Sequence, residues 1–156
     1  MSNKRKIYIV FSWLFVAIIM VIIFKLSAQN AEESKELSDS LVSKIFQWIE
    51  LYIDGELIRK FAHMLEFTAL SFFLDNSIYA TWKRKNANII AFSITVLYAV
   101  GDEIHQLFVP GRAFQTSDIL VDSMGALIGA VLFFVILKLM FNIKERGNKD
   151  GSIETV

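Results

Sequence analysis

The stretch at residues 98–129, YAVGDEIHQLFVPGRAFQTSDILVDSMGALIG, begins and ends in apolar sequence but is crowded with polar groups. Its acidic, basic and amide side chains include Asp102, Glu103, His105, Gln106, Arg112, Asp118 and Asp122. Ionisable groups between apolar segments are costly inside a membrane, and they tend to face a bundle interior or a wet cavity. We expect this stretch to hold the outer end of one membrane helix, a tight turn at VPGR, and the start of the next helix.

The apolar segments that surround this stretch set the fold class. The chain of 156 residues is 54% hydrophobic, which is more than an ordinary soluble domain contains. Residues 7–24 include Ser12 as their only polar side chain, and they are long enough to cross a hydrocarbon core about 30 Å thick. We predict an all-α, polytopic membrane protein: one domain over residues 1–156, a four-transmembrane-helix bundle with spans at about 7–26, 61–79, 89–109 and 119–141.

The distribution of lysine and arginine predicts the orientation of these spans. Basic residues gather in the N-terminal tail, between the second and third spans, and in the C-terminal tail: Lys4, Arg5, Lys6, Lys83, Arg84, Lys85, Lys144, Arg146 and Lys149. The external segment, residues 27–58, is acidic by comparison. Because positive charge accumulates on the cytoplasmic side, we expect a multi-pass chain in the cell membrane with both termini in the cytoplasm.

The external segment contains an amphipathic helix pattern. Its apolar residues recur at spacings of three and four: Leu41, Ile45, Trp48, Ile49 and Tyr52. Such a helix lies on the outer leaflet of the membrane, or it covers the top of the bundle. Periodicity does not separate these two interpretations.

With this topology, three spans bring polar residues to one depth at the outer face. The second span contributes Arg59, Lys60, His63 and Glu66. At about 100° per residue, Asp118 and Asp122 share a narrow arc of the fourth span with Gly125 and Gly129. Glycines at that spacing allow another helix to approach closely, so this face packs a neighbouring helix or forms a homo-oligomer.

The third span has a small and polar stripe that we take as its inward face. That stripe is Thr95, Ala99, Asp102 and Gln106. Glu103 and His105 flank it, roughly 160° apart in a regular helix. We expect at most one of these two side chains at the centre of a pocket, and we favour Glu103.

These residues fit two kinds of chemistry, as well as a plain ion-pair network that locks the bundle top. His63, Glu103 and Asp118 are the candidate catalytic residues, with a histidine as general base and a carboxylate to orient it. The candidate ligand-binding residues are Arg59, Lys60, Glu66, His105, Gln106, Arg112 and Asp122. The cations among them suit an anionic group such as a lipid phosphate or a cell-wall carboxylate.

Several classes of function are disfavoured. The chain has no cysteine, which excludes a thiol nucleophile and a disulfide framework. No HExxH spacing is present, and the neighbouring cations would repel a metal ion, so we expect neither a metal nor a cofactor. The formal net charge is zero, which gives no sign of a nucleic-acid partner.

The segments FKLSAQNAEES, RKFAHMLEF and DEIHQLFVPGRAFQTSDILVDSMGALIG together resemble the VanZ-like family of bacterial membrane proteins over about residues 7–140. By that resemblance the family positions are Lys60, His63, Glu103, Gln106, Arg112, Asp118 and Gly125. Two positions depart from the commoner pattern. Phe67 stands where a tyrosine is frequent, and Asp122 stands where an asparagine is frequent.

The resemblance implies a cell-envelope function without supplying a reaction. The family takes its name from a protein associated with resistance to the lipoglycopeptide teicoplanin. We therefore expect membrane lipids as partners, and an envelope lipid, a lipoglycopeptide or a cell-wall precursor as ligand of a pocket that faces outside. The alternatives are a membrane-embedded hydrolase or transferase acting on an anionic lipid-linked or cell-wall substrate, and a structural or transport partner acting as an oligomer.

Overall fold

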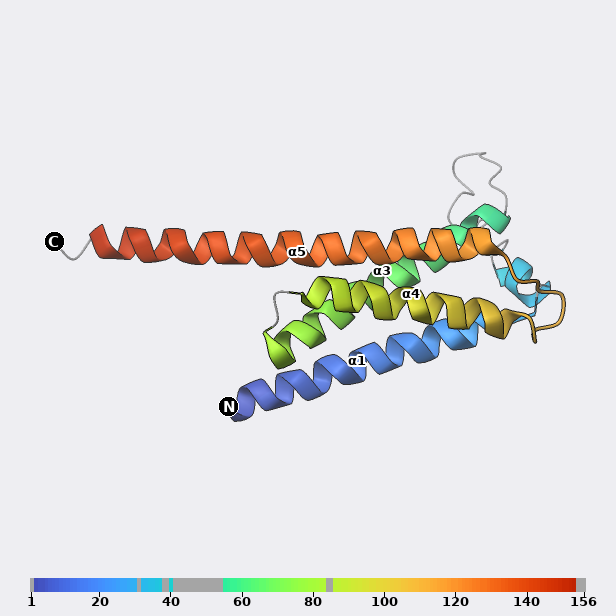
Figure 1. Ribbon diagram of the computed structural model, residues 1–156, viewed down its shortest axis with the longest axis horizontal. Helices are drawn as coiled ribbons and strands as arrows, with labels where there is room; N and C mark the ends of the chain where they lie inside the picture. The colour runs from blue at the N-terminus through green and yellow to red at the C-terminus, as the bar shows by residue number, and fades with distance from the viewer. Residues whose placement is uncertain (1, 31, 38–39, 41–54, 84–85, 154–156) are drawn as a thin grey trace.

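The computed structural model in Figure 1 describes residues 2–30, 32–37, 40, 55–83 and 86–153. Four long helices make up most of these ranges: α1 (Asn3–Ser27), α3 (Gly55–Trp82), α4 (Ala87–Gln106) and α5 (Thr116–Ile153). No strand occurs within the described residues. The prediction of an all-α fold is confirmed.

The helices lie side by side, and successive helices run in opposite directions (Figure 1). Two long-range hydrogen bonds join the start of α1 to the end of α3. The Arg5 guanidinium donates to the Ala80 carbonyl at 3.1 Å, and the Tyr8 hydroxyl donates to Asn76 Oδ1 at 2.8 Å. Figure 1 also shows that the N-terminal end of α1 and the C-terminal end of α5 lie at the same end of the bundle, where α5 extends beyond its neighbours.

Three helices, rather than the predicted four, are long and apolar enough to cross a membrane within the described part of the chain. They are α1, α4 and the Thr116–Ile143 part of α5. The exception is α3, which carries too many polar side chains along its length: Glu56, Arg59, Lys60, His63, Glu66, Asp75 and Asn76. It packs against α1, α4 and α5, so its neighbours shield much of that polarity from the surroundings.

Helix boundaries differ from the predicted spans at several ends. α3 begins at Gly55 rather than residue 61, which shortens the external segment. α4 ends at Gln106 rather than residue 109, and α5 continues to Ile153 rather than ending at residue 141. The predicted amphipathic helix at residues 41–52 lies outside the described residues.

The inward face of α4 is the small and polar stripe that the sequence predicts. Its buried residues are Ala87, Ala91, Thr95, Ala99, Asp102, Glu103 and Gln106. Opposite them, the fully buried Phe67 of α3 lies with its ring centroid 6.2 Å from that of Tyr98. Small side chains on α4 thus leave room for aromatic and polar side chains that α3 brings into the core.

The closest helix contact joins α3 to α5 at the two glycines of the GxxxG pattern. A Cβ atom added to Gly125 would overlap the Met64 carbonyl, and one added to Gly129 would overlap the Thr68 carbonyl. The Thr68 hydroxyl donates to the Gly125 carbonyl at 3.0 Å across this contact. Within this chain, therefore, α3 occupies the small-residue face that the sequence offers for packing.

A methyl group at this contact should be poorly tolerated. We expect Gly125→Ala to lower the melting temperature in detergent by roughly 3–10 °C, because the added Cβ has backbone rather than a flexible side chain in its way. Gly101→Ala is the matched control, since a Cβ there meets nothing within 4 Å. Its gain in helix propensity should leave the melting temperature unchanged or raise it. Equal stability of the two variants would contradict this packing.

Candidate functional site

A type II turn between α4 and α5 sets the position of Arg112. The Arg112 N–H donates to the Val109 carbonyl at 3.1 Å, which closes the four-residue turn. Pro110 fits the second position, and Gly111 has φ 76° at the third, a left-handed conformation that favours glycine. The VPGR motif is therefore the tight turn that the sequence predicts.

The Arg112 side chain ties this turn to two other elements. Its Nε donates to the Gln29 carbonyl, just after α1, at 3.3 Å, and its Nη1 lies 3.5 Å from Gln106 Oε1 at the end of α4. Burial lowers the pKa of the Arg112 guanidinium from its ordinary value, and the nearby Arg59 charge lowers it further. An arginine still remains protonated at physiological pH, so Arg112 presents a partly desolvated positive charge.

Gln106 is the buried link between α1 and α4. Its Nε2 donates to the Ser27 hydroxyl at 3.2 Å and lies 3.4 Å from Asp102 Oδ2. Ser27 is fully buried at the last turn of α1. The segment LSAQN thus contributes a hydroxyl and a backbone carbonyl that hold the amide and the guanidinium in place.

Glu103 fixes the start of the segment that leads into α5. Its Oε1 accepts a hydrogen bond from the Gln115 backbone N–H at 2.6 Å, and only 1% of the residue is exposed. The structure therefore gives this carboxylate a backbone partner rather than a place in the pocket lining.

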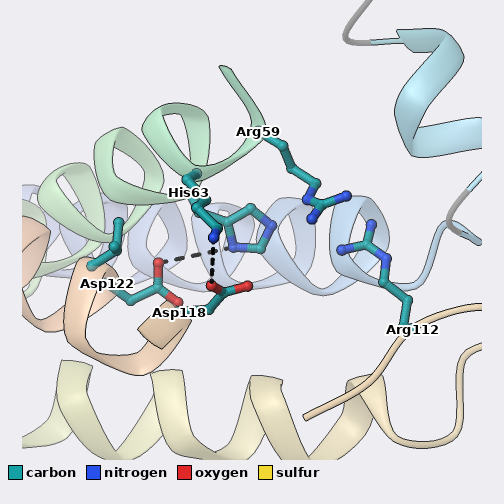
Figure 2. Close-up of a pocket in the computed structure, with 7 residues that line it drawn as sticks. Arg59, His63, Arg112, Asp118 and Asp122 are labelled. Atoms are coloured by element: carbon teal, nitrogen blue, oxygen red, sulfur yellow. Dashed lines mark ion pairs between the residues drawn. The ribbon is translucent and has the colours of Figure 1, made fainter. Parts of the chain in front are cut away.

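A small pocket lies between the first turns of α3, the turn and the first turns of α5. Its cavity volume is about 10 Å³, and its lining consists of Arg59, Lys60, His63, Arg112, Asp118, Val121 and Asp122. Figure 2 shows the Arg59 and Arg112 guanidiniums pointing toward each other, with the His63 ring and the two aspartates beside them. A cavity of this volume holds about one water molecule, and typical sites for small molecules are larger, about 300–1,000 Å³, so a ligand group would enter only as the lining side chains move apart.

Ion pairs join the two helices that form this pocket. Lys60 Nζ lies 2.9 Å from Glu56 Oε1 on its own helix and 3.7 Å from Asp118 Oδ1 on α5. His63 Nδ1 lies 3.9 Å from Asp122 Oδ1 (Figure 2). Asp122 is therefore the carboxylate that lies beside the histidine.

The structure brings some candidate residues together and separates others. Six candidates from the sequence line the pocket: Arg59, Lys60, His63, Arg112, Asp118 and Asp122. Glu103 and Gln106 contact its surroundings through Gln115 and Arg112. His105 packs its ring against Phe24 of α1, with centroids 4.5 Å apart, so it faces away from the pocket as the helical geometry predicts for one of the pair.

Three polar residues that support the site were not among the candidates: Ser27, Gln29 and Asp102. A further buried polar residue, Asp75, lies away from the pocket lining. Asp75 is fully buried on α3, and neither of its carboxylate oxygens has a hydrogen-bond partner among the described residues. In the sequence, the position of Asp75 as the one acidic residue within the mainly apolar run ALSFFLDNSI could have marked it as a candidate buried polar residue. In the described ranges, no group of three or more His, Asp or Glu is placed to hold a metal ion.

The hydrogen bond from the Gln115 N–H to Glu103 should stabilise the segment between the turn and α5 against local unfolding. Glu103→Leu leaves the Gln115 N–H without its acceptor, whereas Glu103→Gln keeps a carbonyl oxygen at that position. We expect trypsin to cleave the Arg112–Ala113 bond of Glu103→Leu roughly fivefold faster than that of wild type, for a loss of about 1 kcal/mol of local stability. Mass spectrometry of the detergent-solubilised protein measures the rate, and equal rates for both variants would contradict the role of this bond.

Comparison with known proteins agrees with the three sequence motifs. No curated protein and no solved structure matches the chain. The VanZ/LLP1 family matches residues 11–138, a range that includes most of α1, all of α3 and α4, and most of α5. The range also contains every residue that lines the pocket. The chain belongs to the VanZ/LLP1 family.

Proposed function

We propose that this protein recognises an anionic group of the bacterial cell envelope, on an envelope lipid or a glycopeptide-like ligand, in a membrane-embedded pocket that faces outside. The observation that carries the proposal is the convergence of Arg59, Lys60 and Arg112 from two separate elements on one compact cavity. Buried ionisable groups in membrane bundles mark binding sites and pathways. The link of the family name to teicoplanin resistance makes lipoglycopeptides candidate ligands.

The size of the pocket limits what it recognises. A cavity volume of about 10 Å³ has room for about one water molecule, so at most a single acidic substituent, and not a whole lipoglycopeptide, would enter as the lining side chains move apart. The remainder of such a ligand would lie outside the pocket, in the outer leaflet or in the envelope. The affinity of the protein for the whole ligand would then depend on the contact between the cations of the pocket and one acidic group at the end of the ligand.

Loss of the pocket should abolish function without loss of the protein. In a bacterial strain that depends on this chain, Arg59→Ala, Lys60→Ala, His63→Ala and Arg112→Ala should each reduce protection against teicoplanin or envelope stress. Lys25→Ala, an exposed cation at the same end of the bundle, is the matched control and should retain protection. If all four variants reach wild-type levels in the membrane and protect fully, the pocket is not the functional site.

The orientation has its own test, because the chain has no native cysteine. Glu36 and Asn86 are exposed; Glu36 follows the C-terminal end of α1, and Asn86 directly precedes α4. Figure 1 shows the C-terminal end of α1 and the N-terminal end of α4 at opposite ends of the bundle. We expect Glu36→Cys to react with a membrane-impermeant maleimide in intact cells and Asn86→Cys to react only after permeabilisation, since basic segments stay in the cytoplasm. The reverse labelling pattern would place the pocket on the cytoplasmic side.

A second candidate function is hydrolysis or group transfer, which the His63–Asp122 pair favours. Asp122 would orient the imidazole, and His63 would take a proton from a water or substrate hydroxyl as that oxygen attacks an ester of the substrate. The bond from the attacked atom to the leaving oxygen would break, and His63 would return the proton to that oxygen. Under this proposal His63→Gln loses turnover of an anionic lipid-linked substrate while binding survives. Loss of binding and function together in His63→Gln would favour recognition alone.

A further inference from the structure

The two arginines of the pocket face each other although their charges repel. In Figure 2 the Arg59 guanidinium, from the first turns of α3, points toward the Arg112 guanidinium, from the turn before α5. The ion pairs of the pocket involve Lys60 and His63 instead. Within the described ranges, neither arginine lies within ion-pair distance of a carboxylate, and the hydrogen bonds of Arg112 go to neutral oxygens.

The two positive charges repel each other, and an anion between the guanidiniums would offset that repulsion. Burial and then the positive charge of Arg59 lower the pKa of Arg112, while the charges of Asp102, Glu103 and Asp118 partly offset that shift. The bonds to Gln29 and Gln106 nevertheless hold Arg112 in this position. A group that carries negative charge on two sides would remove the repulsion and satisfy the free N–H donors of both side chains.

We infer that Arg59 and Arg112 form a clamp for a terminal phosphate group, that is, inorganic phosphate or the phosphomonoester of a lipid. This inference rests on the proposed function and names the ligand chemistry of the same pocket. A carboxylate has one planar edge and satisfies one arginine fork. A tetrahedral phosphate presents pairs of oxygens in different directions, so it accepts from two guanidiniums on opposite walls.

The acidic residues of the pocket limit how many anionic groups of a ligand can bind there. Asp118 and Asp122 lie on the α5 wall, where Lys60 and His63 pair with them. A polyanion that filled the whole pocket would bring its charge against these carboxylates. A single phosphate on the arginine side of the pocket avoids these carboxylates.

The test measures binding to the purified full chain in detergent by isothermal titration calorimetry. The probes are inorganic phosphate, short-chain phosphatidate, short-chain phosphatidylcholine and acetate. We expect both phosphate probes to bind wild type at least tenfold more tightly than acetate or phosphatidylcholine. Arg59→Ala and Arg112→Ala should each weaken phosphate binding by about tenfold or more, because each removes a charge-assisted pair. Arg59→Lys and Arg112→Lys keep the charge but lose the fork, so they should bind with intermediate affinity.

Lys25→Ala is the control for a lost cation and should bind phosphate as wild type does. Melting temperatures confirm that each variant is folded before its affinity is compared. Unchanged phosphate affinity in folded Arg59→Ala and Arg112→Ala, or acetate binding as tight as phosphate binding, would overturn the clamp. Tighter binding of phosphatidate than of phosphate assigns the ligand to a lipid, and equal binding assigns it to free phosphate.

These results are separable from those on the proposed function. If the arginine variants lose envelope protection but phosphate never binds, the pocket functions and the clamp chemistry is wrong. If phosphate binds through the arginines and the pocket variants protect fully, the clamp exists and the proposed function is wrong.

Discussion

The close approach of α3 to α5 is the constraint on which the rest of the site depends. Gly125 and Gly129 let the backbones meet where any Cβ would overlap a carbonyl of α3. One turn from Gly125 on the same face of α5 stands Asp122, and one turn further stands Asp118. The close packing of α5 on α3 that the glycines allow therefore also places these aspartates beside His63 and Lys60 of α3.

A polar helix at the centre of the bundle is the consequence of this packing. α3 carries charge in its first turns and the fully buried Asp75 further along, and the three apolar helices surround it. Burying an ionisable group without a partner costs free energy, so these groups do not add stability by themselves. In the first turns of α3 the charged side chains line the pocket. The structure gives no comparable partner for Asp75 among the described residues.

Much of the site follows from periodicity and from residue types in the sequence. A 3.6-residue repeat places Asp118, Asp122, Gly125 and Gly129 on one face, and the structure packs that face against α3. The same repeat predicts that the Glu103 and His105 side chains point in different directions. In the structure Glu103 accepts a hydrogen bond from Gln115, and the His105 ring packs against Phe24.

The contacts between residues far apart in the chain could not be predicted from the sequence. Nothing local indicates that Arg112 would bond the carbonyl after α1, or that Ser27 would meet Gln106, since residues about 80 positions apart form these pairs. Segment-by-segment hydropathy also took α3 for a fourth span like the others. Its helical character was predictable, but its place among three more apolar neighbours depends on tertiary packing.

The most direct test of this account joins α3 to α5 at the pocket. In the cysteine-free chain, Lys60→Cys and Asp118→Cys are combined, treated with a short thiol-to-thiol cross-linker in the membrane, digested and analysed by mass spectrometry. The account predicts a peptide that joins positions 60 and 118, and none that joins 25 and 118 in the control pair. Absence of the 60–118 peptide despite full labelling of both cysteines would show that α3 and α5 do not build a common pocket.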